Sequence, residues 1–189
     1  MSTRDETWAD RRPNPLLVAW LRTFNAAPVR KRCLVVGCGP GDDAEALASA
    51  GFEVTAIDID PAAVDAVRRR FPRSGVDYEV ADILQPPTAW AARFDLIFEA
   101  STLPALPPDA RRAAMQSMTT LVAPGGRILV LCRAREHDEP LAAAPWPLTR
   151  DELTVFEEAG LRATSVEIVL DGGTPPVRRF RAFFDRLEA

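Results

Sequence analysis

Lysine and histidine are almost absent from this sequence of 189 residues. Lys31 is its single lysine and His137 its single histidine. A Walker-type nucleotide loop requires a lysine in the pattern GxxxxGK[ST], so a loop of that kind is excluded. The 23 basic residues, otherwise all arginine, are outnumbered by 27 acidic ones, and the net charge is -4. Because this balance provides no basic footprint, we expect no nucleic-acid partner.

Cysteines are few, and long apolar runs are missing. The three thiols, Cys33, Cys38 and Cys132, form no CxxC pair and lie in or beside apolar runs. This pattern is typical of reduced thiols in a cytoplasmic protein, and we expect no metal site. No stretch approaches the roughly 18 apolar residues of a membrane span. The charged start of the chain also lacks the apolar stretch of a secretory signal, so we expect a cytoplasmic location and no membrane partner.

Short apolar strands alternate with helices along the chain. The strands are expected at 33–37, 52–58, 76–82, 94–100, 127–132, 161–170 and 177–187. The helices are expected at 42–51, 61–71, 107–123 and 149–160. This order predicts an α/β fold, a doubly wound Rossmann-like seven-stranded sheet with helices on both faces. The hairpin signal "DGGTPP" makes the last strand antiparallel, and a ligand is expected beyond the carboxyl end of the first strand.

A glycine-rich segment, "GCGPGDD", follows the first expected strand. It carries glycines at three alternate positions, Gly37, Gly39 and Gly41. A dinucleotide loop has glycine at the position that Asp42 occupies here. With Asp43 and Glu45, this residue puts three acids in the first turn of a helix, where a pyrophosphate would be repelled. The acids alone are also good partners of the helix dipole, but together with the glycines they favour a positively charged ligand such as S-adenosylmethionine, with Asp42 nearest to it.

Acidic residues also end the second and third expected strands. Asp58 is placed to accept hydrogen bonds from ribose hydroxyls, and Ile59 to lie against an adenine face. Asp60 precedes Pro61 and is expected to cap the following helix. Asp82 is placed to accept a hydrogen bond from the adenine amino group. The backbone N–H of Ile83 is placed to donate a hydrogen bond to a ring nitrogen of the adenine. Taken alone, an aspartate at the end of a strand is more often a turn residue.

The segments "GCGPG", "AIDID", "ADIL", "FDLIFEA" and "LVAPGGRILVL" follow one another at the spacing of a known family. Over roughly residues 30–184 the chain resembles the class I (Rossmann-like) S-adenosylmethionine-dependent methyltransferases. The segments "FEASTLPALPPDARR", "PWPLTRDEL" and "W…PNPLL" are similar to the thiopurine methyltransferase-like branch. Leu103 and Pro104 depart from that branch, which often has bulky aromatic residues or cysteine there.

The resemblance implies S-adenosylmethionine as cofactor and S-adenosylhomocysteine as product. It implies that the glycine loop, which includes Cys38, approaches the methionine part. Glu99 and the backbone of Ala100 are expected beneath the methionine part and the methyl group, with Glu99 as a candidate catalytic carboxylate. The resemblance also implies one domain, with a helical lid in 1–29 and a Rossmann-like core in 30–189. The lid residues that it implies are Trp8, Asn14 and Leu17.

The acceptor side of the site is expected to include Trp8, Leu103 and Trp146. Trp146 stands between two prolines and is either an apolar wall or a loop anchor. His137 is either a general base or a solvated residue, and its charged neighbours favour the second interpretation. For Arg133 and Arg135 two roles are considered: contact with an anionic acceptor, or exposure to solvent. The last strand's arginines are expected on an exposed sheet face: Arg178, Arg179 and Arg181.

These features predict in-line transfer of a methyl group to the thiol, hydroxyl or amine of a small hydrophobic or aromatic molecule. Two alternatives are an RNA or protein methyltransferase and a non-catalytic S-adenosylmethionine-binding module. The net negative charge argues against RNA, and so does the sequence "FEAST" where a planar-nitrogen enzyme has an "NPPY"-type tetrapeptide. The sequence identifies neither the acceptor atom nor the oligomeric state.

Overall fold

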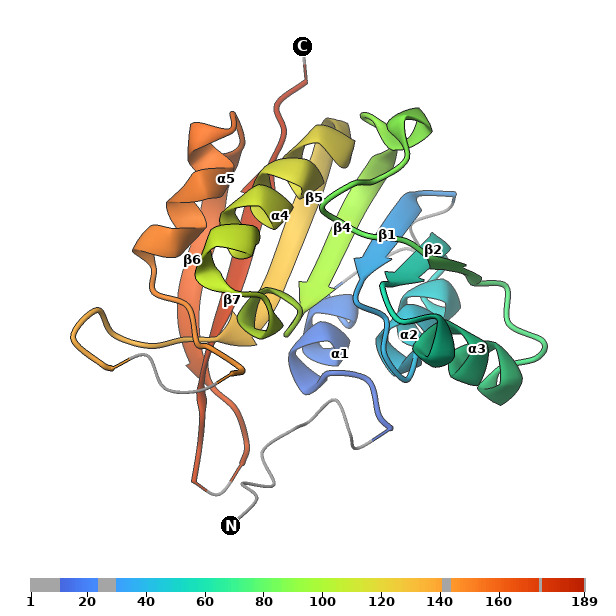
Figure 1. Ribbon diagram of the computed structural model, residues 1–189, viewed down its shortest axis with the longest axis horizontal. Coiled ribbons are helices and arrows are strands. Elements are labelled where there is room, and N and C mark those ends of the chain that lie inside the picture. Colours follow the sequence, from blue (N-terminus) through green and yellow to red (C-terminus); the bar gives the residue numbers. More distant parts are fainter. Residues whose placement is uncertain (1–10, 24–29, 141–143, 174, 189) are drawn as a thin grey trace.

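The computed structural model describes residues 11–23, 30–140, 144–173 and 175–188. In this part of the chain seven strands form one sheet in the order β3-β2-β1-β4-β5-β7-β6 (Figure 1). The strands are β1 (Arg32–Val36), β2 (Glu53–Asp58), β3 (Asp77–Val80), β4 (Phe94–Ala100), β5 (Val122–Arg133), β6 (Arg162–Leu170) and β7 (Arg178–Asp185). The five strands from β3 to β5 pair in parallel, and β7 runs antiparallel to both β5 and β6. The predicted fold class is confirmed.

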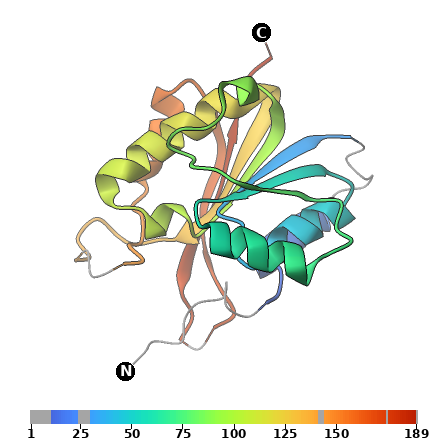
Figure 2. The same ribbon diagram turned by 45° about the vertical axis from the view of Figure 1, so that its right-hand side comes forward.

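Helices cover both faces of the sheet (Figures 1 and 2). They are α1 (Pro15–Leu21), α2 (Asp42–Ser49), α3 (Pro61–Arg70), α4 (Pro108–Leu121) and α5 (Val155–Glu158), with 3₁₀ turns η2 (Thr88–Trp90), η3 (Leu103–Ala105) and η4 (Asp151–Thr154). One core cluster joins α4 and α5 to the sheet, and a second cluster joins α1, α2 and α3 to its other face. Alternate residues of β1 enter opposite clusters, as in a parallel strand that is buried on both faces.

The residues that end and begin these elements explain their bounds. Asp60 caps α3 as expected, because its Oδ1 accepts from the backbone N–H of Ala62 at 2.9 Å. Strand β5 begins at Val122, earlier than predicted, because the segment that contains Gly125 and Gly126 stays in the sheet. A Cβ atom at Gly126 would lie 2.8 Å from the carbonyl oxygen of Ala123, so this close approach requires glycine.

The predicted helix over 149–160 is shorter in the structure and begins with the 3₁₀ turn η4. Glu152 Oε2 accepts from the backbone N–H of Thr149 at 2.8 Å, which is one half of a capping box. Continuous α-helix is limited to the four residues of α5. Within the described residues, no helix combines the length and the apolar character that crossing a bilayer requires.

The prediction of an exposed arginine face on β7 is wrong, because Arg178 and Arg181 are half-buried and Arg178 alternates onto the face of Phe180. Phe180, Ala182 and Phe184 point into the core beneath α4 and α5. Phe183 packs on the opposite face, against Trp20 of α1, with ring centroids 6.0 Å apart. Arg179 shares that opposite face and is only 4% exposed. The side of β7 that carries Arg179 and Arg181 also carries Phe183, which packs against α1.

Candidate active site

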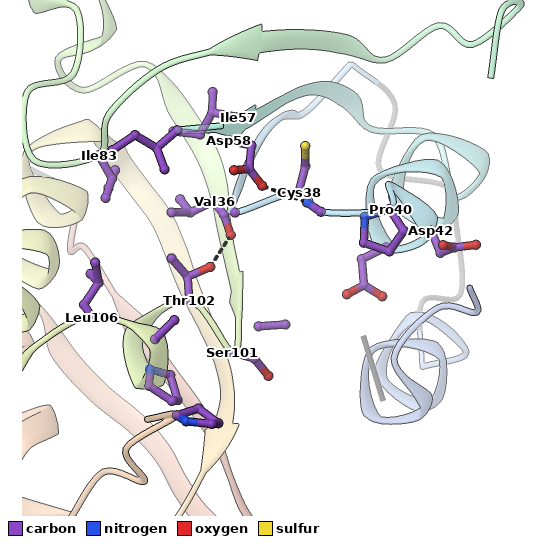
Figure 3. Close-up of a pocket in the computed structure, with 18 of the residues that line it drawn as sticks. Val36, Cys38, Pro40, Asp42, Ile57, Asp58, Ile83, Ser101, Thr102 and Leu106 are labelled. Atoms are coloured by element: carbon purple, nitrogen blue, oxygen red, sulfur yellow. Dashed lines mark hydrogen bonds between the residues drawn. The ribbon is translucent and has the colours of Figure 1, made fainter. Parts of the chain in front are cut away.

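A cavity of about 630 Å³ opens beyond the carboxyl ends of the parallel strands (Figure 3). Its lining residues are Arg12, Val36, Gly37, Cys38, Gly39, Pro40, Asp42, Asp43, Ile57, Asp58, Ile59, Ala81, Asp82, Ile83, Ala100, Ser101, Thr102, Pro104, Ala105, Leu106, Arg133, Ala144, Pro145 and Arg179. Strands β1 and β4 are neighbours at the point where the strand order reverses. The cavity therefore lies where the sequence placed the ligand.

The glycine loop after β1 combines packing with open space. Gly37 has φ +69°, and a Cβ atom there would lie 2.1 Å from Thr102 Oγ1. Thr102 Oγ1 in turn donates to the carbonyl oxygen of Val36 at 2.9 Å, which ties the loop after β4 to the end of β1 (Figure 3). Gly39 has φ +46° and nothing within 4 Å of a Cβ position. Gly37 is therefore required by the protein's own packing, whereas Gly39 leaves space on the cavity wall.

The acids that follow the glycines are not equivalent. Arg70 of α3 holds Asp42 through two hydrogen bonds, one of them from Nη2 to Oδ1 at 2.7 Å. Glu45 accepts from the hydroxyl of Tyr78 at 2.7 Å. In Figure 3, Asp42 lies on the far side of Pro40 from Asp58. Two of the three acids that argued against pyrophosphate are thus already engaged by α3 and β3, so the repulsion is smaller than the sequence suggested.

Asp43 is the acid of this turn that lines the cavity and has no cationic partner among the described residues. One of its oxygens accepts from the backbone N–H of Asn14 at 2.6 Å, which attaches the start of α1 to α2. No arginine, lysine or histidine of the described residues lies within ion-pair distance of it. Burial raises the pKa of Asp43 to about 6, and the Asp42 charge adds to this. The geometry therefore favours Asp43 over Asp42 as the acid that faces a ligand.

The tips of β2 and β3 both reach the cavity. Asp58 accepts from the backbone N–H of Gly39 through Oδ2 and from that of Asp60 through Oδ1, each at 3.1 Å. Its carboxylate therefore lies directly against the glycine loop. Ile59 is 67% exposed at the cavity wall. Asp82 also lines the cavity, and its Oδ1 makes the turn hydrogen bond to the N–H of Leu84 at 2.8 Å.

Glu99 lies behind the cavity wall instead of on it. Its Oε1 accepts from the backbone N–H groups of Thr102 at 2.6 Å and Leu103 at 2.9 Å, which caps the turn η3. Its Oε2 is buried without a hydrogen-bond partner in the described part of the chain. Burial raises its pKa to about 7, opposed by these two N–H donors. The cavity is lined by Ala100 and not by Glu99, so direct contact with a ligand lacks support in this geometry.

The residues expected on the acceptor side have mixed outcomes. Leu103 is fully buried in the core, so the expectation of substrate contact is corrected, and the next residues, Pro104 to Leu106, line the cavity instead. Trp146 donates its backbone N–H to the carbonyl oxygen of Pro104 at 2.7 Å and is not a lining residue, which favours the loop-anchor interpretation. His137 is exposed in the 135–139 loop, away from the lining, which favours the solvated interpretation. Trp8 lies outside the described residues.

Asn14 and Leu17, both expected on a lid, belong to the start of the chain. Asn14 caps α1 by accepting from the N–H of Leu16 at 2.9 Å. Leu17 is fully buried in the core cluster shared with α2 and α3. The described part of the predicted lid is therefore packed on the core next to the cavity, where Arg12 reaches the lining.

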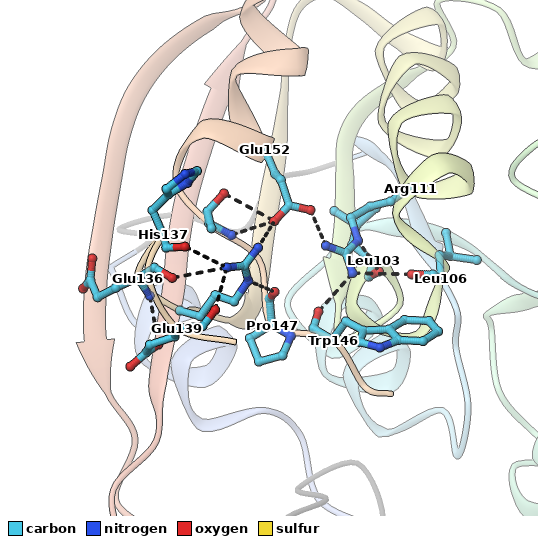
Figure 4. Close-up of polar contacts among 11 residues, drawn as sticks. Leu103, Leu106, Arg111, Glu136, His137, Glu139, Trp146, Pro147 and Glu152 are labelled. Carbon is cyan, nitrogen blue, oxygen red and sulfur yellow. Dashed lines mark hydrogen bonds and ion pairs between the residues drawn. The ribbon is translucent and has the colours of Figure 1, made fainter. Parts of the chain in front are cut away.

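Sequence reasoning missed a buried arginine that joins two walls of the cavity (Figure 4). Arg111 of α4 is 1% exposed. Its Nε donates to the carbonyl oxygen of Leu103 at 3.0 Å, and its Nη2 donates to that of Trp146 at 3.1 Å. Its Nη1 forms an ion pair with Glu152. The only signal in the sequence was the basic residue that follows "ALPP", in a pattern that names no partner.

The fold and these contacts can be set beside known proteins. A family model described as a methyltransferase domain matches residues 33–126. The ubiquinone biosynthesis O-methyltransferase of Aromatoleum aromaticum is 35% identical over 61% of this chain and 49% of that protein. Thiocyanate methyltransferase 1 of Arabidopsis thaliana is 29% identical over 85% of this chain and 70% of that protein.

A solved structure has the same fold. The 1,6-didemethyltoxoflavin-N1-methyltransferase of Burkholderia thailandensis, with bound 1,6-didemethyltoxoflavin and S-adenosylhomocysteine, superposes with a TM-score of 0.76 at 19% identity. The superposition covers 97% of this chain and 82% of that one. This chain belongs to the class I S-adenosylmethionine-dependent methyltransferases.

Membership of the class I methyltransferases explains the sheet order and the place of the cavity. The chain spans about half the length of the first curated methyltransferases that it matches. The thiopurine methyltransferase-like branch stays a prediction. Within the class, the structure adds what the motifs did not contain: the Asp42–Arg70 pair, the buried Glu99 and the Arg111 network.

Proposed function

We propose that this protein is an S-adenosylmethionine-dependent methyltransferase whose acceptor is a small hydrophobic or aromatic molecule with a thiol, hydroxyl or amine. The observation that carries the proposal is the cavity itself. It brings the glycine loop, the acid at the tip of β2 and the Asp82 turn into one wall, beyond the carboxyl ends of β1 and β4. The family membership and the names of the relatives point in the same direction.

The residues present fit this cofactor. Asp58 would exchange its hydrogen bond from the Gly39 N–H for bonds from two ribose hydroxyls. Asp82 and the N–H of Ile83 would hold the adenine edge, with Ile59 over its face. The open space beside Gly39 would admit the methionine part close to the backbone. The cofactor supplies a methyl group on a sulfonium, which already carries a good leaving group.

Asp43 would favour the positive end of the cofactor. It keeps no cationic partner among the described residues, and its raised pKa shows that burial disfavours its charge. A positive ligand group placed near it would lower that pKa and bind more tightly in return. A doubly charged pyrophosphate would meet the same carboxylate unfavourably, even though Asp42 is neutralised. Asp43 is therefore the basis of the electrostatic argument against a pyrophosphate ligand.

The protein's contribution to catalysis would be alignment and exclusion of water. The apolar segment from Pro104 to Leu106 and Pro145 line the same cavity as the glycine loop. Holding donor and acceptor together between these walls can supply several kcal/mol of the barrier, of the order given by effective molarities. Cys38 also lines the cavity, but burial raises its pKa to about 12, so it does not act as a base or nucleophile at neutral pH.

Release of S-adenosylhomocysteine tests the proposal. The protein is incubated with S-adenosylmethionine and a panel of aromatic thiols, phenols and amines, and product is quantified for each acceptor. Turnover that depends on both protein and acceptor is expected for at least one class. Binding of the cofactor without release for any acceptor would contradict the enzymatic proposal and favour a non-catalytic binding module.

A further inference from the structure

Two arginines face each other across the strands that form the acceptor side of the cavity. Arg133 is the last residue of β5, and it stands directly opposite Arg179 of β7 in the antiparallel ladder. Residues at such positions have Cβ atoms about 4.5–5.5 Å apart, and like charges there repel each other. Both residues line the cavity. An arginine pair in this position requires negative charge close to it.

The hydrogen bonds of Arg179 leave part of its guanidinium available. Its side chain is 5% exposed, and its Nε donates to Asp171 Oδ2 at 2.7 Å. Neither Nη group donates a hydrogen bond within the part of the chain that the structure describes. Neither Nη atom is fully buried without a hydrogen-bond partner, so both are at least partly accessible. An oxyanion in the cavity can accept from this end of the guanidinium.

Asp171 is fixed in place and ionised. Its Oδ1 accepts from the backbone N–H groups of Val177 at 2.9 Å and Gly173 at 3.2 Å. Burial opposes its charge, but the hydrogen bonds from Val177 and Arg179 prevail and hold its pKa below the usual range. The acid therefore holds Arg179 through Nε, and neither Nη group donates a hydrogen bond to it.

The charges of the cavity wall are separated by strand. The lining acids follow β1, β2 and β3, on one side of β4 in the sheet. Arg133 and Arg179 belong to β5 and β7, on the other side of β4. The cofactor proposed above has its positive groups and its ribose on the acidic side. The arginine side is left for the second substrate.

We propose that the methyl acceptor carries a carboxylate, which the Nη groups of Arg179 bind at the cavity wall. The inference rests on the proposed function, because it assigns the acidic half of the cavity to the cofactor. A neutral acceptor leaves the two Nη groups of Arg179 without an acceptor in the cavity, and such a site discriminates against the analogue that lacks the hydrogen-bonding group. The acceptor class is thereby narrowed to small apolar or aromatic carboxylates.

Binding of matched probes tests this without requiring turnover. The full chain is saturated with S-adenosylhomocysteine and titrated with 4-mercaptobenzoate and with 4-mercaptobenzamide, which differ in the charge of one substituent. At least tenfold tighter binding of the carboxylate is expected. Equal binding of the two probes would overturn the inference while leaving the methyltransferase proposal intact. Failure of S-adenosylhomocysteine to bind at all would instead contradict the proposed function.

Three variants assign the preference to the residue. Arg179→Met is expected to remove the preference for the carboxylate probe. Arg181→Met is the matched control, because Arg181 lies on the same strand and face, pairs with Glu167 at 2.6 Å and does not line the cavity. Asp171→Asn keeps an acceptor for Nε but removes the competing charge, so it is expected to strengthen carboxylate binding severalfold.

The cofactor's own carboxylate is the other possible source of the anion. If Arg179 bound it, Arg179→Met would weaken binding of S-adenosylhomocysteine more than tenfold and leave the relative affinities of the two probes unchanged. That result would overturn the assignment to the acceptor. Unchanged cofactor affinity together with a lost probe preference supports it.

Discussion

Replacing Arg111 with methionine tests how the acceptor walls are held. The methionine side chain keeps most of the apolar volume but removes the hydrogen bonds to the carbonyl oxygens of Leu103 and Trp146 and the ion pair with Glu152. Arg112 is the matched control, since it is the next residue of the same helix and also forms an ion pair, with Glu158. The two arginines differ mainly in burial.

The difference in burial between Arg111 and Arg112 determines how much stability each substitution is expected to cost. Removing one partner of a buried ion pair costs about 3–5 kcal/mol. Arg111 has 1% of its side chain exposed, whereas Glu152 has 27% exposed and keeps the Thr149 N–H as a donor, so the lower end applies. We expect Arg111→Met to lower the free energy of unfolding by about 3 kcal/mol. Arg112 and Glu158 are 56% and 54% exposed, and an exposed pair contributes less than about 1 kcal/mol.

Urea denaturation of the two variants measures these values, and hydrogen exchange of the Trp146 N–H follows the loop itself. This N–H bonds to the carbonyl oxygen of Pro104 and joins the two segments that Arg111 holds. Its exchange is expected to accelerate in Arg111→Met beyond the effect of global stability, with little change in the affinity for S-adenosylhomocysteine. Equal stability losses in the Arg111 and Arg112 variants, with unchanged exchange at Trp146, would refute the reasoning.

Three further predictions concern the cofactor side. Asp58→Asn is expected to weaken S-adenosylhomocysteine binding about tenfold to a hundredfold, the value of a charge-assisted hydrogen bond, and calorimetry that shows no change would remove its ribose role. Glu99 has its pKa raised from 4.5 to about 7, so the folded state holds the proton that the unfolded state releases, and stability falls as pH rises across that window. The free energy of unfolding of the wild type, relative to Glu99→Gln, should fall by about 3 kcal/mol between pH 4.5 and pH 8, and parallel pH profiles of the two proteins would contradict this. Gly37→Ala and Gly39→Ala should each lose about 1–2 kcal/mol of stability because the backbone at both positions is left-handed. Only the new methyl group at position 37 meets Thr102 Oγ1, so the urea midpoint of Gly37→Ala should be clearly lower. Equal midpoints would show that Thr102 moves aside.

The fold was predictable because its signals are local. Short apolar strands, prolines at helix starts and a hairpin turn each act over a few residues, and together they indicate a doubly wound sheet with an antiparallel last strand. The tips of β2 and β3 were placed for the same reason, since parallel strands bring their carboxyl ends to one edge. Asp58 and Asp82 therefore reached the cavity as predicted.

Partners that are distant in the sequence were not predictable. Asp42 pairs with Arg70, and Arg111 pairs with Glu152, across 28 and 41 residues. From the sequence alone Asp42 counts as a free acid, which overstates the free charge of the glycine loop. No local pattern connects such residues, because their contact depends on how whole elements pack.

Burial of a face was also beyond the sequence. The alternation of β7 grouped Arg179 with Arg181 and Phe183, but it did not show that the core beneath α1 and α2 covers this side. Phe183 was the available signal, since an aromatic residue in that row indicates a packed surface. Similarly, Glu99 is near the end of β4 and Leu103 comes shortly after that strand, yet both side chains are fully buried.

Isothermal titration of the protein with S-adenosylhomocysteine and, separately, with NAD tests the central claim most directly. The account predicts saturable binding of S-adenosylhomocysteine at one site and no measurable heat with NAD, because the carboxylate of Asp43, which has no cationic partner among the described residues, disfavours a pyrophosphate. NAD binding as tightly as S-adenosylhomocysteine, or no binding of the latter, would contradict it.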